Sequence, residues 1–176
     1  MSFHFEIEIL GYRADVVEEL AELIIEVVAN GGSVSFMHPL SKKTAMAFWE
    51  TSLASADRGE RVVLGARENG KLISTVSLLL NCPENQPHRA EIAKLMTRVD
   101  KRGRGVARAL VKEAEQIAVK KGRTLLNLDT AADEGAAGFY ESLGFNKTGV
   151  IPDYALKPHG GLTDTIIYWK KIGNSY

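Results

Sequence analysis

Residues Glu91–Leu110 read E-I-A-K-L-M-T-R-V-D-K-R-G-R-G-V-A-R-A-L, and this stretch decides the fold that we expect. Its first part, 91–99, is rich in β-branched and apolar side chains, as a buried strand is, and Asp100 and Lys101 stop the run. A short basic loop with two glycines follows, and from Val106 apolar residues recur at helical spacing. The stretch therefore predicts a strand, a loop and a helix in direct succession.

The loop 102–107 has three features that suit a phosphate or pyrophosphate. The first turn of a helix carries unpartnered backbone N–H groups and the positive end of the helix dipole. Glycines let a ligand approach that backbone closely, and arginines add bidentate donors. An ordinary solvated basic loop is the alternative. A dinucleotide-binding fingerprint is weakened, because Arg108 occupies its third glycine position, and a G-x-x-x-x-G-K-[ST] phosphate loop is absent.

Composition narrows the class of protein. We expect the 176 residues to form one domain, 1–176, since 45% hydrophobic and 25% charged side chains are typical of a globular protein. The net charge is zero, so no global charge favours nucleic acid or a membrane surface as a partner. Cys82 is the only cysteine, which excludes an internal disulfide and a zinc site of several thiolates, and we expect no metal. The N-terminus does not resemble a signal peptide, and we expect a cytoplasmic protein.

Hydrophobic periodicity and turn signals predict the order β-α-α-β-β-β-α-β-α-β-β. We expect strands at 3–10, 61–67, 71–80, 91–99, 124–129, 145–151 and 165–171, and helices at 15–30, 41–59, 106–121 and 133–143. Asp15 and Ser41 are expected to begin the first two helices, Asn69-Gly70 to form a hairpin, and 152–161 to form a long turn. The helix at 106–121 makes its flanking strands parallel neighbours, so we expect an α/β fold with helices on both faces of a mixed sheet.

Two motifs resemble a known family. Arg102, Gly105 and Ala107 carry the pattern R-x-x-G-x-A, and 136–145 read A-A-G-F-Y-E-S-L-G-F. Together with the order of elements, they resemble the acetyltransferase (GNAT) family over nearly the whole chain. The resemblance implies a central sheet of about six to seven strands flanked by about four helices. It also implies an enzyme that transfers an acetyl group from acetyl-CoA, its cosubstrate, to an amine.

The resemblance also implies where acetyl-CoA would lie. The expected cofactor-binding residues are Leu95, Met96, Thr97, Arg102, Gly103, Arg104, Gly105, Val106, Ala107, Thr130 and Phe139. The pantetheine arm would pair with the central strand as an extra strand does, and the backbone N–H of Met96 would polarise the thioester carbonyl. The chain departs from the family at Glu134, where Asn often contacts the cofactor, and Thr130 is the expected substitute.

Acetyl transfer to an amine also needs a base and an acid. An amine with a pKa of about 10 is mostly protonated at pH 7, and the departing thiolate must gain a proton. Glu91 and Asp129 are candidate bases, because each carboxylate lies in an otherwise apolar strand where an unpaired charge is costly. A salt bridge for Glu91 and helix capping for Asp129 are the alternatives. By resemblance Tyr140 is the acid, with simple packing as its alternative.

A closer resemblance, to the tabtoxin-resistance acetyltransferases, lies in 31–37, 89–96, 128–130 and 152–154. It implies direct attack in a ternary complex by a small-molecule amine, an amino-acid-like toxin, and a role in antibiotic or toxin resistance. We expect the acceptor to contact Phe36, Met37, His38, Trp49 and Tyr154. A non-catalytic acetyl-CoA-binding or sensing module of the same fold is the alternative function, and a peptide N-terminus also remains an open acceptor. The sequence does not indicate an oligomeric state.

Overall fold

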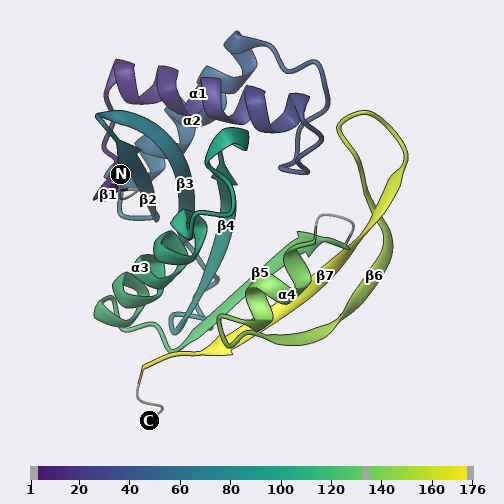
Figure 1. Ribbon diagram of the computed structural model, residues 1–176. Helices are drawn as coiled ribbons and strands as arrows, with labels where there is room; N and C mark the ends of the chain where they lie inside the picture. Colours follow the sequence, from purple (N-terminus) through teal and green to yellow (C-terminus); the bar gives the residue numbers. More distant parts are fainter. Residues whose placement is uncertain (1–3, 133–134, 174–176) are drawn as a thin grey trace.

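The computed structural model describes residues 4–132 and 135–173 and contains a seven-stranded mixed sheet of order β1-β2-β3-β4-β5-β7-β6 (Figure 1). The strands are β1 (Glu6–Ile9), β2 (Arg61–Glu68), β3 (Lys71–Leu79), β4 (Arg89–Thr97), β5 (Leu125–Ala131), β6 (Asn146–Leu156) and β7 (Leu162–Lys171). The helices are α1 (Ala14–Ala29), α2 (Lys42–Asp57), α3 (Val106–Lys120) and α4 (Ala136–Glu141), and a 3-10 turn, η1, covers Val99–Lys101. The expected α/β fold and the expected order of elements are confirmed.

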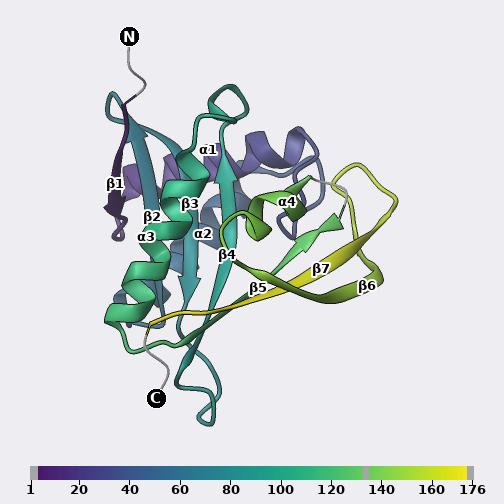
Figure 2. The same cartoon turned by 60° about the horizontal axis from the view of Figure 1, so that its bottom comes forward.

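The sheet separates two buried apolar clusters. Helices α1 and α2 cover one face and α3 covers the other, as Figure 2 shows. Adjacent residues Val63 and Leu64 of β2 enter opposite clusters, because successive side chains of a strand point to opposite faces. Trp49 of α2 is fully buried in the first cluster, and Leu110 of α3 is fully buried in the second. Both helices are therefore held on the sheet by the apolar stripes that the sequence predicts.

The predicted helix and turn signals are confirmed in two places and wrong in one. Ser41 caps α2, since its hydroxyl accepts a hydrogen bond from the N–H of Thr44 at 3.1 Å. Asn69 and Gly70 have φ of +50° and +80°, the left-handed values that a tight hairpin turn needs. Asp15 does not cap α1. It lies inside the first turn, where it accepts a hydrogen bond from the Arg13 guanidinium at 3.0 Å.

The C-terminal hairpin is longer than predicted. Strand β6 continues through Pro152 to Leu156 and β7 begins at Leu162, so the turn covers 157–161 rather than 152–161. The register shifts between Ile151 and Ala155, and this bulge accommodates a proline that cannot donate to a ladder. Helix α4 begins at residue 136 rather than 133. Residues 133 and 134 lie outside the described part of the chain. The loss of a cofactor contact at Glu134, where the family often has Asn, therefore stays a prediction.

Strands β4 and β5 are parallel neighbours at one end and then diverge (Figures 1 and 2). Their pairing joins Arg89–Glu91 to Leu125–Asn127. Strand β4 also contains a bulge, because its register against β3 shifts between Ala93 and Met96 and Lys94 takes a φ of +53°. A bulge bends its strand and increases the local twist, which suits the divergence of β4 from β5. The opening between the two strands holds the candidate site.

Candidate active site

Two adjoining cavities lie along the opening between β4 and β5. The first, of about 450 Å³, is lined by Val27, Asn30, Gly31, Gly32, Val34, Leu95, Met96, Thr97, Arg102, Ala107, Thr130, Gly135, Ala136, Phe139 and Tyr140. The second, of about 420 Å³, is lined by Thr97, Lys101, Arg102, Gly103, Gly105, Val106, Ala107, Arg108 and Phe139. The two cavities adjoin, because they share Thr97, Arg102, Ala107 and Phe139, and together they are called the trough below. Most of the predicted cofactor-binding residues therefore come together along it.

One end of the trough is the N-terminus of α3. Gly105 is the N-cap residue, with a φ of +81°, and it has no side chain that could cap the helix. The first-turn N–H groups are therefore available to an anion. A Cβ built on Gly103 or Gly105 would meet nothing within 4 Å, so the space beside this backbone is open. The turn η1, which sequence reasoning missed, leads the chain from β4 into this loop.

The edge of β4 that faces the trough is not paired with any described neighbouring strand over residues 95–97. In the described chain, pairing with β5 ends before residues 95–97 of β4. The N–H of Arg98 donates to the carbonyl of Ile73 at 2.9 Å, and alternate residues of a strand direct their backbone groups to the same side. The N–H of Met96 is therefore directed to β3, which corrects its predicted role. Thr97 faces the opposite side, where its carbonyl accepts a hydrogen bond from Arg102 Nε at 3.3 Å.

Glu91 lies where β4 and β5 separate. Its side chain is half-buried, and burial together with the negative charge of Asp129 raises its pKa. The nearest cation is Arg89, whose Nη1 lies 3.8 Å from Glu91 Oε2 but only 2.7 Å from Asn127 Oδ1. The salt bridge to Arg89, which was the predicted alternative to a role as base, is therefore present but long. Because burial and a like charge raise its pKa, this carboxylate is a stronger base than an exposed glutamate.

Asp129 is exposed at the end of β5, and Thr165 Oγ1 donates to its Oδ2 at 3.1 Å. The alternative role as a helix cap is wrong, because the N-cap residue of α4 is Gly135. Asp129 instead acts electrostatically on Glu91. The next residue, Thr130, lines the trough, so this carboxylate stands beside the end of the trough that is remote from the α3 N-terminus.

Lys94 is a site residue that sequence reasoning missed. The bulge of β4 holds it beside the loop 31–40, where its Nζ donates to Ser35 Oγ at 2.9 Å and lies 5.9 Å from the centroid of the Phe48 ring. Burial lowers the pKa of Lys94, while the charges of Asp129 and Glu91 oppose that shift. The only signal in the sequence was a lysine within an apolar strand. The acceptor end of the site therefore combines two carboxylates with one ammonium group.

Tyr140 and Phe139 both line the trough from α4. The ring centroid of Tyr140 lies 5.0 Å from that of Phe139 and 5.8 Å from those of Phe145 and Tyr168. Only 6% of Tyr140 is exposed. Tyr140 therefore packs α4 onto the sheet and also borders the trough, so a role in packing and the predicted role as an acid are compatible.

The loop 31–40, which carries the predicted acceptor residues Phe36, Met37 and His38, meets the β6–β7 turn (Figure 1). The N–H of His38 donates to the carbonyl of Pro158 at 2.9 Å, and the His38 and His159 rings lie 4.5 Å apart. Phe36 packs edge-on against Phe48 at 5.3 Å. Met37 and Tyr154 are exposed.

Trp49 is wrong as an acceptor contact, because 0% of it is exposed. It lies under Phe48, with the two ring centroids 5.0 Å apart, and supports that half-buried ring from below. Within residues 4–132 and 135–173 no group of three or more His, Cys, Asp and Glu side chains is placed to hold a metal ion. No described helix has the length and hydropathy of a membrane span.

The sequence profile of the acetyltransferase (GNAT) family matches residues 31–145, which include the loop 31–40, β4, the basic loop and α4. Human N-acetyltransferase 8B is 36% identical over 86 residues, which are 48% of this chain and 38% of that protein. The chain spans less than half of the length of the curated relatives it matches.

Two solved structures share the fold. Ribosomal-protein-alanine N-acetyltransferase from Brucella melitensis has a TM-score of 0.80 at 20% identity, over 94% of this chain and 99% of that one. The structure of yncA from Salmonella typhimurium, with its cofactor acetyl-CoA, has a TM-score of 0.77 at 17% identity, over 96% and 95% of the two chains.

Proposed function

Since the chain belongs to the acetyltransferase (GNAT) family, we propose that it transfers an acetyl group from acetyl-CoA to the amine of a small molecule. One observation carries the proposal. The trough extends from the uncapped backbone amides at the start of α3, which suit a pyrophosphate, to Thr130. Thr130 follows Asp129, which interacts with Glu91, and these two carboxylates suit an ammonium group. A molecule with an anionic middle and a reactive thioester end matches such a trough.

The residues of the trough suit the parts of acetyl-CoA. The amides around Gly103 and Gly105, with Arg102 beside them, would bind the pyrophosphate. The unpaired edge of β4 would bind the pantetheine arm as an added strand. The N–H of Thr97 would polarise the thioester carbonyl from the same side of β4 as the carbonyl that Arg102 binds. The solved relative with bound acetyl-CoA supports this assignment at the level of the fold.

The side chains around the acceptor end supply the proton transfers. Glu91, assisted by the charge of Asp129 that raises its pKa, takes a proton from the ammonium group directly or through water. The amine nitrogen then attacks the thioester carbonyl in a ternary complex, a C–N bond forms, the C–S bond breaks, and the nitrogen releases its second proton to solvent. Tyr140 donates its phenolic proton to the departing thiolate, which leaves as the thiol of CoA.

Lys94 favours an amino-acid-like acceptor. A small amino acid carries an ammonium group for the two carboxylates and a carboxylate that needs a cation, and Lys94 is the ammonium group beside them. We therefore retain, as part of the proposal, a tabtoxin-resistance-like activity on an amino-acid-like toxin in the cytoplasm. Phe36 and Phe48 would form the apolar wall of that acceptor site.

The test is thiol release from acetyl-CoA with a panel of amines that includes amino-acid-like β-lactams, polyamines, aminoglycosides and short peptides. We expect release with the amino-acid-like amines and its collapse in Tyr140→Phe. Release with peptides alone would refute the small-molecule acceptor. Binding of acetyl-CoA without release by any amine would favour a sensing module of the same fold.

A further inference from the structure

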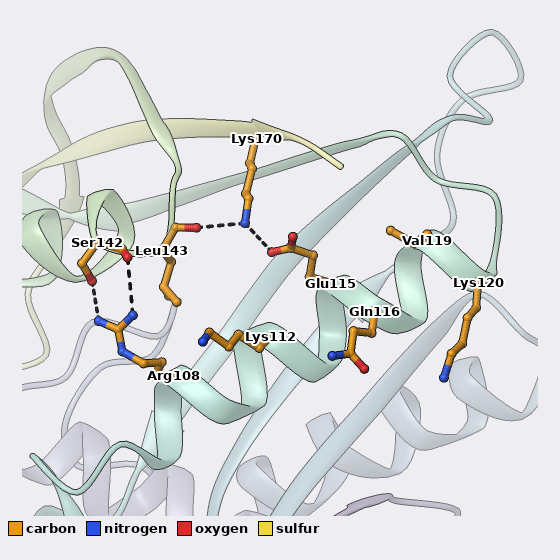
Figure 3. Close-up of a pocket in the computed structure, with 9 residues that line it drawn as sticks. All are labelled: Arg108, Lys112, Glu115, Gln116, Val119, Lys120, Ser142, Leu143 and Lys170. Carbon is orange, nitrogen blue, oxygen red and sulfur yellow. Dashed lines mark hydrogen bonds and ion pairs between the residues drawn. The ribbon is translucent and has the colours of Figure 1, made fainter. Parts of the chain in front are cut away.

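A third cavity, of about 560 Å³, lies between α3 and the chain that joins α4 to β6, beside β7 (Figure 3). It is lined by Arg108, Lys112, Glu115, Gln116, Val119, Lys120, Ser142, Leu143 and Lys170. The lining contains four cationic side chains and one carboxylate. None of these residues belongs to the acceptor end of the trough described above.

The one carboxylate is already neutralised. Glu115 accepts from Lys170 Nζ at 2.6 Å, and the same Nζ donates to the carbonyl of Leu143 at 2.9 Å. The side chains of Lys112 and Lys120 make no ion pair or hydrogen bond with any residue of the described chain. Figure 3 shows the Lys112 side chain on the Arg108 side of the cavity and Lys120 at its far end. The cavity therefore carries uncompensated positive charge along one face of α3.

The end of the cavity near the N-terminus of α3 is built to donate hydrogen bonds. Arg108 donates to Ser142 Oγ at 2.6 Å and to the Ser142 carbonyl at 3.4 Å, which holds the guanidinium against α4 (Figure 3). Lys112 lies one helical turn further along α3, about 5.4 Å of helix rise. Arg108 also lines the cavity at the α3 N-terminus, so its side chain borders both the predicted pyrophosphate site and the basic cavity.

We propose that Arg108 and Lys112 bind the 3′-phosphate of the CoA nucleotide. This inference rests on the proposed function. The pyrophosphate of CoA joins the pantetheine arm to a 3′-phosphoadenosine. If the arm follows β4 from the amides around Gly105, the nucleoside must leave the pyrophosphate on the other side, toward Arg108. A ribose phosphate is dianionic near neutral pH and prefers a guanidinium fork with a second cation beside it.

The experiment compares acetyl-CoA with acetyl-3′-dephospho-CoA, a donor that lacks only this phosphate. We expect wild-type kcat/KM to be about tenfold higher for acetyl-CoA, the size of one charge-assisted hydrogen bond at a partly exposed site. Lys112→Met should remove most of that preference by lowering kcat/KM for acetyl-CoA alone. Lys120→Met is the matched control, because it removes the same charge from the far end of the cavity, and it should retain the preference.

Calorimetric binding of CoA and 3′-dephospho-CoA gives the same comparison without turnover. Equal kcat/KM and equal Kd for the two nucleotides in the wild type would overturn the inference and leave the proposed function intact. An equal loss with both donors in Lys112→Met would overturn it as well, because the lysine would then support the helix rather than the phosphate. If neither nucleotide bound, the inference would be overturned together with the proposed function.

Discussion

Replacing Tyr140 by Phe tests the proposed acid most directly, because it removes one hydroxyl and keeps the ring. Only 6% of Tyr140 is exposed, and its ring packs on those of Phe139, Phe145 and Tyr168, as a Phe ring would. The free energy of unfolding should therefore change by less than about 1.5 kcal/mol. General acids contribute roughly 100-fold to 10,000-fold. A thiol with a pKa of about 8.5 is a good leaving group even without an acid, so we expect a rate effect at the lower end of this range.

We therefore expect kcat to fall about 100-fold in Tyr140→Phe, or about 2.7 kcal/mol in the activation free energy, with an unchanged Kd for acetyl-CoA. The assay is initial-rate thiol release at saturating acetyl-CoA and acceptor. Tyr168→Phe is the matched control, since its hydroxyl lies in the same aromatic cluster but donates to Glu141 at 3.4 Å. That variant should lose up to about 1 kcal/mol of stability and keep its kcat. A wild-type kcat in Tyr140→Phe would refute the role of its hydroxyl.

Four further predictions concern the acceptor end, the basic loop and the core. Asp129→Asn should move the acid limb of the kcat/KM profile to lower pH, since it removes a charge that raises the pKa of Glu91, whereas Glu91→Gln should abolish that limb. Lys94→Met should raise KM for amino-acid-like acceptors about tenfold but leave KM for simple amines unchanged in the same assay. Gly105→Ala should cost about 1–2 kcal/mol in denaturant unfolding, because a φ of +81° disfavours a side chain, and should weaken acetyl-CoA binding. Trp49→Ala should cost about 3–5 kcal/mol. Trp49→Phe should cost far less in the same unfolding experiment, because the buried indole N–H has no partner in the described chain.

The parts of this molecule that follow from local rules could be predicted from the sequence. The helical stripe from Val106 and the turn at Asn69-Gly70 depend on spacing and on backbone preferences that are readable in a few residues. The pairing of β4 with β5 followed from the helix that connects them. The glycines at the start of α3 indicated the proposed anion-binding end of the site, because their backbone preferences are equally local.

The features that sequence reasoning missed depend on contacts between distant segments. Trp49 was expected at the acceptor together with the neighbouring loop residues, yet the packing of α1 on α2 buries it completely. The bulge that brings Lys94 beside Ser35 arises from the register of β3 against β4, which no short pattern encodes. The N–H of Met96 was expected to polarise the thioester carbonyl, but the sequence does not show to which side of β4 each backbone group points.

The divergence of β4 from β5 explains how one fold supplies both a binding edge and a base. If β5 continued alongside β4, it would occupy the edge of β4 around Thr97, and no ligand could pair there. Where the strands separate, Glu91 is buried enough for its pKa to rise, and Asp129 adds a like charge. Lys94 opposes both effects as a nearby cation, so the bulge that helps to open the site also limits how far the base pKa rises. We infer that removing Lys94 would shift the acid limb of the pH–rate profile to higher pH, opposite in sign to the effect of Asp129→Asn.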